Sequence, residues 1–148
     1  MSVLYLVDTN VISAGAPSRI APPALIAWMD SHSASLFISA VTVAEIEDGI
    51  AKARREGATR KATDLKAWFD VLLHLYDDRI LAFDTATARV AGHLSDHVRG
   101  QGQAPGFADI IIAATAQRHG LTILSRNIRH FEPLGVRVLD PFLALPPP

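Results

Sequence analysis

Residues 107–127, FADIIIAATAQRHGLTILSRN, decide the fold because they join an apolar helix directly to an apolar strand. The segment 107–119 is apolar almost all round, which is typical of a helix that is covered on nearly every side. Gly120 is a helix stop, and the run 121–124 has the length and character of an interior strand. We therefore expect one buried helix and one buried strand in this stretch.

Helix patterns and short apolar runs alternate along the rest of the chain. Further strands are predicted at the apolar runs 3–7, 36–38, 80–83 and 136–139. Further helices are predicted, from apolar periodicity and from proline and glycine signals, at 22–29, 41–55, 59–76 and 85–98. This alternation favours an α/β fold of three α/β/α layers, with a mainly parallel sheet of about four to five strands.

The bulk composition limits the possible functions. A chain of 148 residues suits one domain, so we expect a single domain over 1–148 with a loose, proline-rich tail at 144–148. The absence of cysteine excludes disulfides, thiolate zinc sites and cysteine nucleophiles. The formal net charge is −1, so the molecule has no overall positive field that would attract nucleic acid, and any such affinity must come from local arginines and bound metal.

The N-terminal sequence MSVLYLVDTN does not resemble a signal peptide. It has no basic start, and Asp8 interrupts its apolar stretch. No run approaches the roughly 18–20 apolar residues that span a bilayer. We therefore expect a soluble, cytoplasmic protein with no membrane partner.

Three acidic residues follow strands or begin helices in this arrangement. Asp8 follows the first predicted strand, Glu45 lies near a helix start, and Asp109 lies in the first turn of the buried helix. Ligands of parallel sheets bind outside the carboxyl ends of the strands, so these carboxylates are expected to converge there. Neighbouring carboxylates raise one another's pKa, and a hard cation such as Mg²⁺ relieves the repulsion. Such a metal would activate water and stabilise charge on a phosphodiester, with Ser125 and Asn127 placed to orient the water or bind the phosphate.

Each acid also has a purely structural interpretation. Asp8 suits a turn or a helix cap, and Glu45 has the capping-box spacing from Thr42. Asp109 suits the first turn of a helix because a carboxylate there meets the positive end of the helix dipole. It is still the most informative of the three, since it interrupts an apolar face where an unpaired carboxylate is costly.

Four ordered segments resemble the PIN-domain ribonucleases, specifically the VapC-type toxins of bacterial toxin–antitoxin pairs. These segments are LVDTNVIS at 6–13, ISAVTVAEIEDGI at 38–50, ADIIIAATAQRHGLTILSRN at 108–127 and IRHFEPLGVRVLD at 128–140. Together they cover nearly the whole chain in the order found in the family, and they imply a PIN-like fold.

The resemblance also implies roles for individual residues. It assigns the acidic metal site to Asp8, Glu45 and Asp109, and it matches Ser125 and Asn127 to polar catalytic positions. It matches Thr9, Asn10 and Ser39 to positions that support the site. Many members carry a fourth acid where this chain has His130. For His130, metal binding, phosphate binding and simple packing beside Phe131 remain open.

The family further implies an activity and partners. Its members cleave RNA, often structured RNA such as tRNA, with Mg²⁺ or Mn²⁺. They are usually held inactive by a small VapB-type antitoxin that covers the active cleft, and they commonly form homodimers. Arg126 and Arg129 are candidate phosphate contacts. The Trp68–Phe69 face and the segment 22–29 offer either core residues or an apolar surface for an antitoxin helix or a second subunit.

Three other functions compete with this interpretation. A receiver-type phosphoacceptor is disfavoured because it needs a lysine near the last strands, whereas the last lysine here is Lys66. A PIN-fold interaction module without catalysis is disfavoured because all three acids are present, although His130 departs from the pattern. A metal-dependent phosphohydrolase acting on another substrate stays open, and RNA degradation with Mg²⁺ that EDTA abolishes would discriminate against it.

Overall fold

A five-stranded parallel sheet forms the centre of the computed structural model, which describes residues 2–148. Its strands are β1 (Tyr5–Val7), β2 (Leu36–Ser39), β3 (Ile80–Leu81), β4 (Thr122–Leu124) and β5 (Val138–Leu139). They lie in the order β3-β2-β1-β4-β5, and every neighbouring pair is parallel. The predicted α/β class and its parallel sheet are confirmed.

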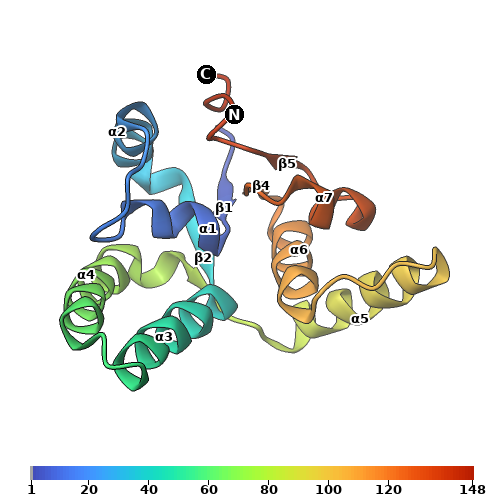
Figure 1. Cartoon of the computed structure of the whole chain (residues 1–148). Helices are drawn as coiled ribbons and strands as arrows, with labels where there is room; N and C mark the ends of the chain where they lie inside the picture. The colour runs from blue at the N-terminus through green and yellow to red at the C-terminus, as the bar shows by residue number, and fades with distance from the viewer. Residues whose placement is uncertain (1) are drawn as a thin grey trace.

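Helices cover both faces of the sheet. They are α1 (Thr9–Ile12), α2 (Pro23–Ser31), α3 (Ala40–Arg55), α4 (Thr59–Tyr76), α5 (Thr85–Gly100), α6 (Phe107–His119) and α7 (Ile128–Phe131). Single 3₁₀ turns lie at Ser13–Gly15, Ser33–Ser35, Asp77–Arg79 and Glu132–Leu134. Helices α1–α4 gather on one side of the sheet and α5–α7 on the other (Figure 1). The three-layer prediction is therefore confirmed.

The central strand β1 is buried on both faces. Successive strand residues point to opposite faces, so Tyr5 and Val7 pack with α3 and α4, whereas Leu6 packs with α5 and α6. This explains why the strand is a continuous apolar run rather than an alternating one. Burial of these two apolar clusters is the main force that holds the layers together.

Parallel register brings the ends of distant strands to the same edge. Val7 of β1 pairs with Leu124 of β4, and the Asp8 amide donates to the Leu124 carbonyl at 2.9 Å. Because β2 runs parallel beside β1, Ser39 also ends at this edge. The residues that follow β1, β2 and β4 are therefore close together although they are far apart in sequence.

Some predicted boundaries are wrong. The first strand begins at Tyr5 rather than Val3, because Val3 and Leu4 are exposed to solvent. The third strand ends at Leu81 rather than residue 83. Residues 144–148 contain no helix or strand, and Pro146 among them is buried.

The helices agree more closely with prediction. The buried helix spans Phe107–His119, and Gly120 ends it with a φ of 67°, a conformation that favours glycine. The short helices α1 and α7 were not predicted. No helix among residues 2–148 is both long and apolar enough to cross a bilayer.

Candidate active site

Asp8 has two roles at the end of β1. Its Oδ1 accepts a hydrogen bond from the Thr9 amide at 2.8 Å and so caps α1. Its Oδ2 accepts from the Ser125 hydroxyl at 2.7 Å. The side chain is nearly fully buried. The cap interpretation is confirmed, but it uses only one of the two oxygens.

Ser125 is the hub of a buried polar network. Its Oγ accepts from the Asn127 amide at 2.9 Å while donating to Asp8. Asn10 Oδ1 accepts from the Arg126 amide at 3.1 Å, and Asn10 Nδ2 lies 3.4 Å from both Asp8 Oδ2 and Ser125 Oγ. This network fixes the loop after β4 against the start of α1.

Glu45 reaches the same region from α3. The Thr9 hydroxyl donates to Glu45 Oε1 at 2.7 Å and lies 3.1 Å from the Thr42 hydroxyl. The capping-box interpretation is wrong, because Ser39 caps α3 by accepting from the Val41 amide, and Thr42 lies inside the helix. Glu45 is therefore held by α1, and Ser39 starts the helix that carries Glu45.

Asp109 approaches from the opposite layer. It lies in the first turn of α6, which Gly106 precedes as N-cap. Its Oδ2 is 3.1 Å from Nδ1 of His130 in α7. The imidazole of His130 is about half exposed and contacts Asp109. It does not pack into the core as Phe131 does, so the packing interpretation of His130 is wrong.

All three acids line one cavity of about 450 Å³. They share its wall with Thr9, Asn10, Ser13, Ala14, Arg19, Ile20, Arg126, Asn127 and Phe142. Ser39 and Ser125 are buried behind this wall. Arg129 and His130 line a neighbouring cavity together with Asp109 and the loop 103–106.

The carboxylates affect one another's protonation. Burial raises the pKa of Asp8, the Ser125 and Thr9 hydrogen bonds partly offset this, and the charge of Asp109 raises the pKa further. Burial also raises the pKa of Asp109, the His130 side chain opposes the shift, and Glu45 adds to it. Ionised, these groups repel one another in a partly desolvated site, and a cation would relieve that repulsion.

The donor set fits a magnesium ion that keeps much of its water. Mg²⁺ prefers oxygen ligands and is usually bound directly by only one or two carboxylates. Among residues 2–148, no group of three or more His, Asp or Glu side chains is placed so that it could hold a metal ion as the side chains stand. Direct bonds from all three acids would need side-chain movement, whereas one or two acids together with water molecules match the usual Mg²⁺ site.

Ser125→Ala tests the polar network. The change leaves the Asn127 amide and Asp8 Oδ2 without their shared partner. We expect RNA cleavage, the activity that the family resemblance implies, to fall about 10–100-fold, the usual loss when a residue that positions a metal ligand is removed. Steady-state kinetics on RNA measures the effect. Thr115→Ala is the matched control, because its buried hydroxyl bonds only to the Ile111 carbonyl within α6. Equal losses of activity in the two variants would contradict a positioning role for Ser125.

Arg19 and Phe142 are among the cavity-wall residues that no sequence pattern indicated. Arg19 lies in the segment after α1, and Phe142 lies near the C-terminus, where the Arg126 guanidinium sits 4.5 Å from its ring centroid. Neither position belongs to a periodic pattern. A cation–π contact of this kind holds the Arg126 side chain beside the acids.

The fold and the cavity define an α/β protein with an acidic centre at the carboxyl edge of a parallel sheet. The chain belongs to the PIN domain family, whose family model matches residues 5–134. The family resemblance stated from the sequence is thereby confirmed.

Relatives align along nearly the whole chain. It is similar to Toxin FitB of Neisseria gonorrhoeae, with 32% identity over 144 residues that cover 94% of this chain and 99% of the relative. It is 34% identical to VapC ribonuclease Y4jK of Sinorhizobium fredii over 143 residues, covering 94% and 98%. The crystal structure of FitAcB from N. gonorrhoeae matches with a TM-score of 0.81 and 34% identity, over 93% of this chain and 98% of that chain.

Proposed function

We propose that this protein is the toxin ribonuclease of a toxin–antitoxin pair and cleaves RNA phosphodiester bonds with Mg²⁺. The observation that carries the proposal is the presence of Asp8, Glu45 and Asp109 on the wall of one cavity. The names of its relatives, a toxin and a ribonuclease, support it. The proposed enzyme is an endoribonuclease, which cleaves within RNA chains, and it acts in the cytoplasm.

Each residue of the site has a chemical task in this proposal. Asp8, Glu45 and Asp109 would hold Mg²⁺, or Mn²⁺ in its place, and the ion supplies charge that stabilises the phosphodiester and lowers the pKa of water. Ser125 holds the carboxylate of Asp8, and Thr9 holds that of Glu45. Asn127 and Arg126 face the cavity, where they contact the RNA phosphate.

The proposed protein partner is a small VapB-type antitoxin. An apolar cavity of about 410 Å³ lies between α2 and α4, and its wall includes Ile26, Met29, Trp68, Val71 and Leu75. Val71 and Leu75 are largely exposed. Such a groove suits the apolar face of an amphipathic helix. We also propose that the protein forms a homodimer. A molar mass in solution of twice the 16.0 kDa of one chain would support this.

Two experiments test this function. Purified protein is incubated with RNA in Mg²⁺ and in EDTA, and we expect cleavage only with the metal. Expression of the wild type beside Asp8→Asn in bacteria, with total RNA profiling, should slow growth and degrade RNA only for the wild type. Hydrolysis of small phosphodiesters without RNA cleavage would favour the phosphohydrolase alternative instead.

Metal-free stability is expected to fall as pH rises. The pKa of Asp8 in the folded protein lies above its ordinary value of 3.8, so between those two values the folded state binds a proton that the unfolded chain has lost. This protonation stabilises the folded state at acidic pH, and the benefit is lost as pH rises through the raised pKa. Thermal unfolding in EDTA measures the effect.

Asp8→Asn provides the reference for this measurement, because it has no titrating group at the position. The Tm of the wild type, relative to that of the variant, should decrease from acidic to neutral pH. Parallel Tm curves would contradict the raised pKa of Asp8.

A further inference from the structure

A second cavity opens beside the acidic one and shares part of its wall. It has a volume of about 640 Å³, and the residues common to both cavities are Thr9, Ser13, Arg19 and Glu45. Volumes of this size accommodate small organic ligands. An RNA strand with one phosphate at the acids can therefore continue into the second cavity along the protein surface.

The second cavity has the charge that an RNA backbone needs. Its wall contains the cations Arg19 and Lys61, and Glu45, on the shared wall, is the acid among the lining residues. No ion pair among residues 2–148 involves either cation. Both side chains are exposed, so both are available to phosphate oxygens.

A tight turn holds Arg19 at the junction of the two cavities. Residues 16–19 read Ala-Pro-Ser-Arg, and the Arg19 amide donates to the Ala16 carbonyl at 3.2 Å. Pro17 and a positive φ of 68° at Ser18 are the features of a type II turn. Because Ala16 is buried, the turn is anchored, and Arg19 extends from a fixed backbone.

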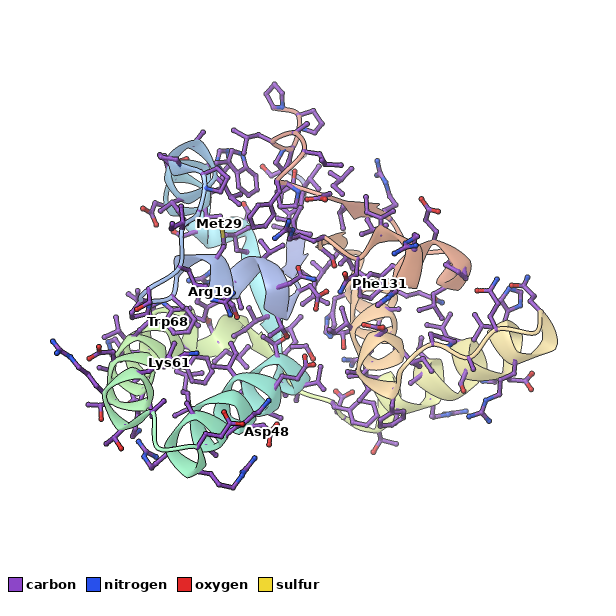
Figure 2. The ribbon with its side chains drawn as sticks, in the orientation of Figure 1. Arg19, Met29, Asp48, Lys61, Trp68 and Phe131 are labelled. Atoms are coloured by element: carbon purple, nitrogen blue, oxygen red, sulfur yellow. The ribbon has the colours of Figure 1, made fainter. Side chains whose placement is uncertain are left out.

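An aromatic ring lies beside these cations. Trp68 of α4 is partly buried and lines the second cavity, with Leu65 and Ile46 as apolar neighbours. Figure 2 shows Arg19, Trp68 and Lys61 on the side of the molecule where α4 lies. Proteins bind single-stranded RNA by stacking bases on aromatic rings and pairing phosphates with cations.

We propose that the second cavity is a nucleotide subsite for the RNA substrate, in which Arg19 and Lys61 bind successive phosphates and a base packs against Trp68. This inference rests on the proposed ribonuclease function. The subsite gives the RNA strand a path from the acidic centre towards α4. It assigns RNA binding to Arg19, Lys61 and Trp68, which lie outside the hydrogen-bond network of Asp8 and Glu45.

The salt dependence of RNA binding tests the two cations. Binding of 5′-labelled random-sequence single-stranded RNA is measured in Mg²⁺ at several salt concentrations, in an Asp109→Asn background that keeps the RNA intact. The slope of log K against log salt is negative, and each lost phosphate contact reduces its magnitude by about 0.7. Arg19→Gln and Lys61→Gln should each produce this change, and Arg60→Gln, the exposed neighbour on α4, should not.

Fluorescence tests the aromatic contact. The chain has two tryptophans, so in Trp28→Phe the remaining indole belongs to Trp68, and RNA should quench its emission. An unchanged salt slope in both cation variants, or an unquenched Trp68, would overturn the subsite. Binding of a polyglutamate peptide gives a further test. The subsite would also be overturned if Lys61→Gln abolished binding of this peptide but left RNA binding unchanged, because the cavity would then be a site for acidic peptide.

The two proposals fail in different ways. Wild-type protein that cleaves no RNA in Mg²⁺ would refute the ribonuclease function. Wild-type cleavage together with unaltered RNA binding by the cation variants would refute the subsite alone.

Discussion

Asp8→Asn and Asp109→Asn should each lower the rate of RNA cleavage more than about 100-fold, because even residues that only position a metal ligand typically contribute 10–100-fold. Each substitution keeps the size of the side chain but removes one of the negative charges on the cavity wall. The measurement is the initial rate of RNA cleavage at saturating Mg²⁺.

The fold is expected to survive both substitutions. Burial raises the pKa of both carboxyls, so replacing either one removes a desolvated charge from the metal-free protein. The Tm without metal should therefore stay constant or rise. Asp48→Asn is the matched control, since Asp48 is an exposed acid of α3 and should leave the rate unchanged. Full activity of Asp8→Asn or Asp109→Asn would refute the acidic site.

Phe131→Ala should destabilise the protein by about 3–5 kcal/mol, the usual cost of truncating a buried aromatic side chain. Phe131 is fully buried in an apolar cluster with residues of α5 and α6. It belongs to the short helix α7 that also carries His130, and it anchors that helix (Figure 2). For a chain of this length the Tm falls by about 10 °C, which calorimetry or thermal unfolding measures.

Phe107→Ala serves as its control. The Phe107 side chain is 66% exposed at the start of α6, so its removal should change the unfolding free energy by about 0.5 kcal/mol or less. Similar losses in the two variants would show that Phe131 does not anchor the core.

The long elements were predictable because their residues carry periodic signals. The helix patterns at 59–76 and 107–119 agree with α4 and α6 at both ends. Helices α1 and α7 each have only four residues, which is too short for any period to appear. Their position is set instead by tertiary contacts, such as the burial of Val11 beneath α3.

Asp8 and Asp109 were predictable because Asp8 follows a predicted strand and Asp109 lies in the first turn of a predicted helix, whereas the helix-start signal for Glu45 was wrong because Ser39 caps α3. Once the sheet is parallel, Asp8 and Ser125 must end at one edge, and the structure joins them by a hydrogen bond. Arg19 was not predictable, because a type II turn usually signals itself by glycine at the position that Ser18 occupies. The contact of His130 with Asp109 was also hidden, since it depends on how α7 leaves β4.

The pairing of β1 with β4 also sets the timing of activation during synthesis. Asp8 and Ser125, which share a hydrogen bond, are separated by 117 positions, and β1 lacks one of its two neighbours until β4 exists. A ribosome must therefore translate past Ser125 before the nuclease centre can close. A product that ends before β4 would lack that centre and should not cleave RNA.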